Sequence, residues 1–367
     1  MPVNLALGHV STDFMIAALM IYSLAVLAFA GDFAFGRPRR GAEAGKAQLR
    51  ARAGALATVG AASSGTAAGA VGSGAAGAVG AAGSGAAGSA GGDTPVPDSM
   101  PAIALSPLRA IMAAGPWVRA GMALSTAGVL AHALAVLTRG LAVHRAPWGN
   151  MYEFVTALTC FAAIFFLWVM IRYRAWSLGV FVRGAVVVIL GLAETLIYTA
   201  AGNLVPALQS YWLSIHVTAM TVATGVFFVA AVLGVVYLVV DRYNRRVAAG
   251  KSQPGNGIIA RLPSLEQLDR LAYRTVVFGF PVWTFGVMAG AIWADEAWGR
   301  YWGWDPVETW AFITWVVYAA FLHSRATAGW RGRRAHYVQL LGFVTLAFNI
   351  LVVQVSITGM HSYAGVG

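Results

Sequence analysis

The sequence predicts an all-α protein with about eight membrane-spanning helices. Hydrophobic residues make up 59% of the 367 residues and charged residues only 11%, far from the average of a soluble domain. Apolar runs of about 20 residues recur along the chain, and each is long enough to cross a hydrocarbon core of roughly 30 Å. We expect helices at 10–30, 118–138, 151–171, 180–200, 213–240, 275–294, 306–324 and 337–359.

The first apolar run, from Val10 to Ala30, is expected to stay in the protein as a spanning helix. It lacks the basic front end and the small-residue cleavage site of a signal peptide, and RPRR follows it. From Ala53 to Gly92 the chain is nearly all Ala, Gly, Ser and Val, which predicts a disordered linker. An Ala-rich helix at the membrane surface is the alternative for this stretch. We therefore expect an N-terminal helix (1–30), a cytoplasmic linker (31–117) and a membrane domain (118–367).

The distribution of basic residues predicts the orientation of these helices. With both termini outside, all but three of the 25 Lys and Arg residues lie in or beside the inner segments, and the three left on the outer side are Arg139, Arg145 and Arg300. The sequence pI of 10.2 is thus mostly a topology signal, and we expect no nucleic-acid partner. Cys160 is the only cysteine, so the chain has no internal disulfide and no thiol-exchange pair.

The expected start of the seventh helix lies in WGRYWGWDPVETW, residues 298–310, which holds four tryptophans. Asp305, Pro306 and Glu308 form the pattern of an N-cap, a first-turn proline and a capping-box acid. One or two tryptophans here would suggest an interfacial aromatic belt. Four exceed that expectation, and Trp302 and Trp304 lie in a glycine-punctuated loop where they can pack flat against a ligand. Covering about 100 Å² of ring face contributes about 2.5 kcal/mol at roughly 25 cal/mol/Å².

Three other segments are expected on the same outer surface as this stretch. They are PWGNMYEF (147–154), His216 in LQSYWLSIHV and His361 in ITGMHSYAG. A lone histidine at a helix end is more often an interface residue than a ligand. Two histidines beside an aromatic platform suggest instead a planar metal complex held from both faces, namely haem with two imidazole ligands. Structural zinc is disfavoured because its thiolates and close histidine spacing are missing.

These segments carry a family resemblance. WGRYWGWDPVET is similar to the tryptophan-rich WGxxWxWDxxxT (WWD) signature of the haem-handling protein superfamily. PWGNMYEF, LQSYWLSIHV, ETWAFITWVVYAAFLHSR and GMHSYAG resemble the CcsA (ResC) family of system II cytochrome c maturation, called CcsB in some bacteria. The resemblance covers roughly residues 118–364. Val307 departs from it, because the family often has lysine there.

The resemblance implies a haem-handling and haem-transport subunit of cytochrome c synthase (haem lyase) in a bacterial cell membrane. It would carry haem b to the outer face for thioether attachment to CxxCH apocytochromes c, together with a ResB/Ccs1-type membrane partner. Implied metal ligands are His216, His361 and, within the membrane, His323. His323 lies 18 residues after Asp305, about 27 Å along a helix, so it cannot share the outer iron. Other expected haem contacts are Trp298, Trp302, Trp304 and Asp305.

The sequence leaves other functions possible and does not assign a role to several other polar residues. The chain could be a system I haem-delivery protein, a haem exporter without ligation activity, or a quinone-linked electron carrier with two imidazole ligands. His9 and His336 are expected at the interface, His132 in the membrane without a visible partner, and His144 outside. Glu153 and Glu194 are carboxylates that could each pair with an outer arginine or only cap a helix.

Overall fold

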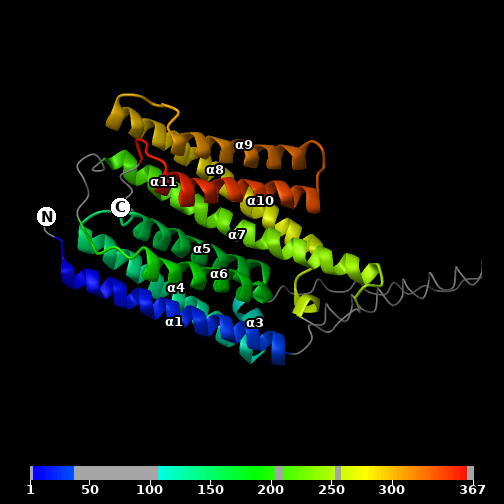
Figure 1. The fold of residues 1–367 in the computed structure, drawn as a ribbon. Helices are drawn as coiled ribbons and strands as arrows, with labels where there is room; N and C mark the ends of the chain where they lie inside the picture. The colour runs from blue at the N-terminus through cyan, green and yellow to red at the C-terminus, as the bar shows by residue number, and fades with distance from the viewer. Residues whose placement is uncertain (1–2, 37–105, 203–209, 253–257, 362–367) are drawn as a thin grey trace, which may run out of the picture. The chain divides into compact units, whose positions relative to one another are not determined.

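The computed structural model describes residues 3–36, 106–202, 210–252 and 258–361, and all regular structure within them is helical (Figure 1). The chain divides into two units, Pro38–Ser106 and the remainder, and the description that follows concerns the remainder. The expected Ala/Gly-rich linker lies outside the described residues. The α-helices are α1 (Leu5–Phe35), α3 (Pro107–Met112), α4 (Pro116–Val143), α5 (Met151–Tyr173), α6 (Gly179–Leu196), α7 (Tyr211–Ala248), α8 (Leu265–Trp298), α9 (Pro306–Ala326), α10 (Arg333–Phe348) and α11 (Gln354–Ser356). Short 3₁₀ turns lie at Trp176–Leu178 and Ile258–Arg261, and a π-helix at Asn349–Val353 links α10 to α11.

Seven helices of the described residues are long and apolar enough to cross a membrane, which fits the expected polytopic membrane protein. The seventh expected span (306–324) forms α9, but α9 is not among these seven helices because Glu308, His323 and Arg325 make it more polar. Most helices extend beyond the expected ranges; α8, for example, begins at Leu265 rather than 275. Hydropathy detects only the apolar part of a helix, and Ser264 caps α8 a few turns earlier.

Aromatic side chains of α1 pack against glycines of the neighbouring helices α4 and α6. A Cβ atom at Gly128 would lie 2.6 Å from the Tyr22 ring, and one at Gly121 or Gly179 would lie 2.7 or 2.5 Å from Phe29. Glycine therefore provides the space into which these buried rings fit. This is the small-residue packing that membrane helices use when no hydrophobic effect draws them together.

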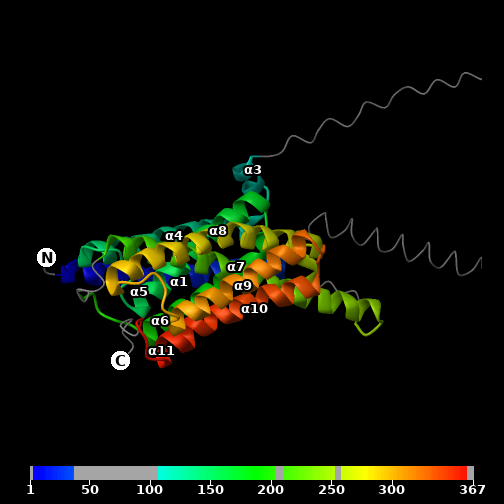
Figure 2. The same ribbon diagram turned by 90° about the horizontal axis from the view of Figure 1, so that it is seen from above.

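The second half of the chain packs around α7, which runs beside α5, α8 and α10 (Figures 1 and 2). At its centre the rings of Phe227 on α7 and Tyr318 on α9 stack with centroids 4.0 Å apart, and Trp283 of α8 packs beside Phe227. Gly225 lets the backbones of α7 and α5 approach closely, since a Cβ atom there would lie 2.6 Å from a carbonyl oxygen of Leu158. These contacts fix the relative positions of the helices that carry the site.

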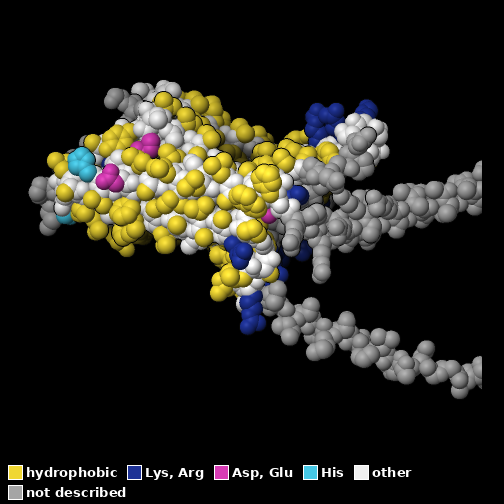
Figure 3. Space-filling model, turned by 90° about the horizontal axis from the view of Figure 1, so that it is seen from below, with side chains coloured by type: hydrophobic (Ala, Val, Ile, Leu, Met, Phe, Trp, Pro, Cys, Tyr) yellow, Lys and Arg dark blue, Asp and Glu magenta, His cyan; other side chains and the backbone are white. Residues whose placement is uncertain are grey.

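The two ends of this bundle differ in their polar side chains. Hydrophobic side chains cover its middle, and the visible Lys and Arg side chains gather at one end (Figure 3). This end includes the last turns of α7 and α9, which carry Arg245, Arg246 and Arg325. We call it the basic end. The opposite end, where α8 finishes at Trp298 and α9 begins at Pro306, is the tryptophan end.

Candidate functional site

A cavity opens at the tryptophan end of the bundle. The space within it, counted together with the open solvent at its mouth, amounts to about 1210 Å³. Helices α5, α7, α8, α9 and α10 contribute to its walls, together with the loop before α5 and the end of the described chain. Side chains that define its character are Trp148, Asn150, His216, Met220, Trp283, Trp293, Trp298, Trp302, Asn349 and His361.

The tryptophan-rich stretch begins α9 as its sequence predicts. Asp305 is the N-cap, Pro306 occupies the first turn, and Glu308 completes a capping box. The Glu308 carboxylate accepts hydrogen bonds from the backbone N–H groups of Asp305 (3.2 Å) and Gly303 (2.9 Å). The loop in front of α9 is therefore held by the helix that it precedes.

Asp305 also binds His361, which lies 56 residues further along the chain. One carboxylate oxygen accepts a hydrogen bond from His361 Nδ1 at 2.8 Å, and the other accepts one from the Met360 backbone N–H at 2.6 Å. Burial raises the pKa of the Asp305 carboxyl, but hydrogen bonds from His361, Met360 and Val307 outweigh burial and lower this pKa below its ordinary value. Asp305 is thus an anion that orients His361.

His216, on α7, is oriented by α8. Its Nδ1 lies 2.7 Å from the carbonyl oxygen of Gly286, and its ring stacks on Trp293 with centroids 6.2 Å apart and an interplanar angle of 11°. Trp293 also meets the His361 ring edge-on at 5.9 Å. The two imidazoles therefore pack against the same buried indole.

These contacts determine which nitrogen of each imidazole carries the proton. A carbonyl or carboxylate oxygen can only accept, so Nδ1 is the donor in both His216 and His361. In a neutral imidazole the other nitrogen, Nε2, then keeps its lone pair. A second-shell acceptor on Nδ1 is the usual support of a metal-binding histidine. Both imidazoles that line the cavity thus carry the proton on Nδ1 and the lone pair on Nε2.

The expected tryptophan contacts divide into two groups. Trp298 and Trp302 line the cavity, and Trp298 meets the His361 ring edge-on at 5.1 Å. Trp304 does not line it: its side chain is 67% exposed and packs edge-on against Trp302 at 5.7 Å. Its backbone has a φ of 55°, an unusual left-handed conformation for a bulky residue, so the chain turns its indole outward just before α9.

His323, the third expected ligand, lies apart from the cavity. It is on the exposed face of α9 near the basic end, and Phe312 and Val316 lie on the same face towards the tryptophan end. Because α9 is continuous from Pro306 to Ala326, His323 lies about 27 Å along this helix from Asp305. The structure brings together four of the expected site residues with Asp305 behind them, and it leaves Trp304 and His323 outside.

Glu153, Glu194 and His132, whose roles the sequence left open, each have a polar partner in the structure. Glu153 pairs with Arg139 and Arg145, whereas Glu194 accepts a hydrogen bond from Tyr152 Oη at 2.7 Å. The buried His132 has a partner, since its Nε2 lies 3.0 Å from the carbonyl oxygen of Thr156.

The other three histidines lie outside the cavity lining. His9 and His144 are exposed. The expectation for His336 was wrong, because it is buried. Its ring stacks on Tyr237 at 3.9 Å, and its Nδ1 lies 2.9 Å from Gln339 Oε1.

Two parts of the site were not predicted from the sequence. Trp293 lies inside an apolar span, where the sequence does not distinguish it from other hydrophobic residues, although its spacing of five residues from Trp298 extends the tryptophan cluster upstream. Asn349 lines the cavity at the start of a π-helix, a feature common at functional sites. No pattern in the sequence indicates that π-helix.

The described residues contain no group of three or more His, Cys, Asp or Glu side chains that could hold a metal ion. The cavity is therefore best described by its two histidines and its aromatic walls.

Fold and cavity together define a polytopic helical membrane protein with a site of histidine and tryptophan at one end. Residues 148–361 match the family described as Cytochrome C assembly protein. Because this match covers more than half of the chain, the chain belongs to that family, and it has a role in cytochrome c assembly.

Several curated relatives carry one name. The chain is 38% identical over 237 residues to "Cytochrome c biogenesis protein CcsA" of Guillardia theta, covering 59% of this chain and 76% of the relative. Proteins of the same name from Synechococcus sp. (strain CC9605) and Mesostigma viride are 36% and 34% identical; the aligned regions cover 59% and 63% of this chain and 77% and 81% of those proteins. A solved structure named "Cytochrome c Heme Lyase CcmF" aligns with 67% of this chain and 43% of that chain, at a TM-score of 0.47 and 20% identity.

Proposed function

We propose that this protein is the haem-handling subunit of a system II cytochrome c synthase. Haem b is its substrate and enters the cavity at the tryptophan end. His216 and His361 bind the iron from opposite faces, and Trp298 and Trp302 pack against the porphyrin. A client apocytochrome with a CxxCH motif then receives the haem.

A single observation carries this proposal. Two imidazoles line one cavity, and each donates Nδ1–H to a fixed acceptor, so that each offers the Nε2 lone pair as an axial ligand. Aromatic side chains around them suit a flat apolar ring. A cavity for a non-metal ligand would not need both imidazoles held in this tautomer.

The chemistry of attachment needs thiols that this chain does not supply. Each thioether forms when a client thiol adds across a haem vinyl group: carbon and sulfur join, the thiol proton goes to the other vinyl carbon, and no net oxidation occurs. Cys160 is buried in α5 and does not line the cavity, so both sulfurs come from the client. The protein contributes positioning, which removes the entropy of encounter, and the client histidine replaces one axial ligand.

The distribution of basic residues also supports an orientation of the protein in the membrane. Basic residues gather at the end opposite the cavity, which supports a cytoplasmic basic end and a cavity on the outer face of a bacterial cell membrane, with both termini outside. A ResB/Ccs1-type partner would hold the client there. His323 faces outward from α9 near the basic end, so a haem bound by it would lie against lipid or a partner helix.

The visible spectrum of the purified protein tests the outer site. We expect a six-coordinate haem spectrum in the wild type and its loss in His216→Ala and in His361→Ala. His9→Ala is the matched control, because His9 is exposed and does not line the cavity. A wild-type protein that neither contains haem nor binds added haem would contradict the proposal.

Co-expression with the partner and a CxxCH client tests attachment. We expect covalent haem on the client, lost in either histidine variant. Haem export that proceeds without the partner, and with no covalent product, would favour the exporter instead. Reversible turnover with quinol and no covalent product would favour an electron carrier.

A further inference from the structure

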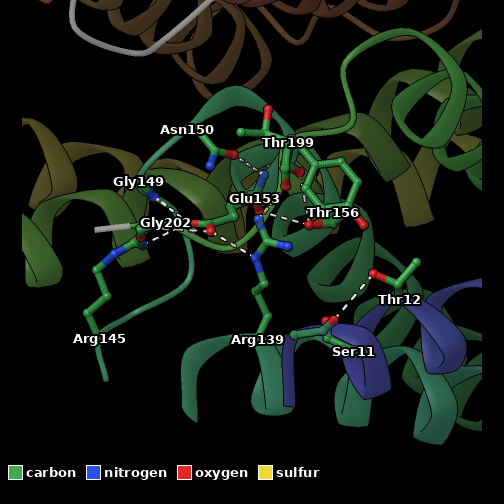
Figure 4. Close-up of polar contacts among 12 residues, drawn as sticks. Ser11, Thr12, Arg139, Arg145, Gly149, Asn150, Glu153, Thr156, Thr199 and Gly202 are labelled. Carbon is green, nitrogen blue, oxygen red and sulfur yellow. Dashed lines mark hydrogen bonds and ion pairs between the residues drawn. The ribbon is translucent and has the colours of Figure 1, made fainter. Parts of the chain in front are cut away.

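A buried ionic network lies beside one wall of the cavity and is not explained by haem ligation. Its centre is Glu153 in the first turn of α5, which is only 1% exposed (Figure 4). Arg139 Nε of α4 donates to one carboxylate oxygen at 2.9 Å, and Arg145 Nη1 donates to the other at 2.8 Å. A buried carboxylate is costly unless it is paired in this way.

The same carboxylate holds the cavity wall. The backbone N–H of Gly149 donates to a Glu153 carboxylate oxygen at 2.9 Å, and the backbone N–H of Glu153 donates to Asn150 Oδ1 at 2.9 Å. Trp148, Gly149 and Asn150 all line the cavity. Two hydrogen bonds to one residue therefore fix the wall against the start of α5 (Figure 4).

The two arginines extend the network to the connection that leads towards the His216 helix. Arg139 Nη2 donates to the carbonyl oxygen of Thr199 at 2.5 Å, and Arg145 Nη2 donates to that of Gly202 at 3.2 Å. Thr199 and Gly202 follow α6 in the chain. The network thus joins the loop before α5 to the segment after α6.

The distribution of basic residues gives an independent reason for a role of this network. Among the basic residues that the structure describes, only Arg139, Arg145 and Arg300 lie at the tryptophan end, and Arg139 and Arg145 are the partners of Glu153. Basic residues that oppose the orientation signal of a membrane protein need another reason to be there. Pairing with a buried carboxylate beside the cavity provides one.

We propose that Glu153, paired with Arg139 and Arg145, is a positioning residue that fixes the Trp148–Asn150 wall and so retains haem in the cavity. This inference rests on the proposed function. The network does not touch the iron ligands His216 and His361. Its loss therefore changes how long haem stays, while the axial ligation of bound haem is unchanged.

The test compares haem release from the purified full-length protein into an excess of a haem scavenger. For Glu153→Gln we expect the dissociation rate to rise about tenfold or more, because variants of one binding site differ mainly in their off-rates. The six-coordinate spectrum of the loaded protein should stay that of the wild type. Glu194→Gln is the matched control: its carboxylate bonds to Tyr152, next to Glu153, but not to the loop.

A second pair of variants covers a failure of Glu153→Gln to fold. Arg145 is more accessible, with 15% of its side chain exposed, and Arg145→Gln leaves the Arg139–Glu153 pair intact. We expect the faster release from Arg145→Gln and a smaller increase from Arg145→Lys, which keeps a charge for Glu153 but loses the forked guanidinium that also reaches Gly202. A general loss of structure would not be rescued by lysine in this way.

The outcomes separate the two proposals. Haem release at the wild-type rate from folded Glu153→Gln, or from Arg145→Gln where the former does not fold, would overturn the positioning role and leave the proposed function intact. A change in axial ligation in these variants would also overturn it. A wild-type protein that binds no haem would overturn both.

Discussion

The two imidazoles of the cavity have the same tautomer but different support. His216 comes from a regular helix and donates to the uncharged carbonyl of Gly286, whereas His361 follows the last helix and donates to the carboxylate of Asp305. Both pack against Trp293. The cavity is therefore chemically asymmetric although its two candidate ligands are of one type.

Because of this asymmetry, the imidazole that is the stronger metal donor is not the one whose position is held more rigidly. A carboxylate on Nδ1 makes an imidazole a stronger donor to a metal than a carbonyl does. His361 is thus the stronger donor, but it lies in a turn after α11 and not in a helix. His216 has weaker electronic support, and α7 holds its backbone. We expect variants on the two sides to differ in size and in kind.

The largest effect is expected for Asp305→Ala. This change removes the N-cap of α9, which costs about 1 kcal/mol, and removes the acceptor of both His361 and Met360. Loss of such outer-shell support typically lowers metal affinity about 10- to 100-fold. Haem titration of the purified protein measures this; affinity equal to that of the wild type would show that His361 needs no carboxylate behind it.

The next effect is expected at Gly290, on the side of His216. A Cβ atom there would lie 2.5 Å from His216 Nδ1, so Gly290→Ala should displace the imidazole from Gly286 and lower haem affinity about tenfold. Gly286→Ala is the matched control. It adds the same atom one turn earlier, against the flexible side chain of Met220, and it keeps the carbonyl. Equal affinities in both variants would contradict a role for the bond to Gly286.

Asp305→Asn is expected to have a smaller effect, because asparagine also caps helices. An amide has one acceptor oxygen, so it cannot serve His361, Met360 and Val307 together. Without the anion His361 is a weaker donor, and we expect the haem reduction potential to rise and its affinity to fall by less than about tenfold. Redox titration with optical detection measures the potential. An unchanged potential would exclude an electronic role for the charge.

Asp305→Asn should also change how the stability of the haem-free protein depends on pH. The pKa of Asp305 is lowered in the folded state by its hydrogen bonds, despite its burial. The stabilisation is therefore complete above the unfolded-state pKa of about 3.9 and is lost as the pH falls through the lower, folded-state pKa. The difference in thermal stability between wild type and Asp305→Asn should be constant from neutral pH down to about pH 5 and shrink below about pH 4.

Local patterns in the sequence predicted a good part of this molecule. Apolar runs gave the number and order of the long helices, and Asp305, Pro306 and Glu308 gave the start of α9, because caps depend on neighbouring residues. The contact between Asp305 and His361 spans 56 residues and depends on how α9 and the tail pack, so no local pattern contains it. Trp293 was hidden for a similar reason, since in an apolar span a site tryptophan resembles any other hydrophobic residue.

The two neighbouring tryptophans of the motif give the smallest expected effect and the sharpest contrast. Trp302 lines the cavity, whereas Trp304 is exposed with a left-handed backbone, and sequence alone could not separate them. Glycine adopts that backbone without strain, and relief of about 1 kcal/mol or more should offset the lost ring contacts in Trp304→Gly. We therefore expect near-wild-type stability and haem release in Trp304→Gly, and faster release in Trp302→Ala. The reverse order of release rates would mean that Trp304 turns inward to the porphyrin when haem is bound.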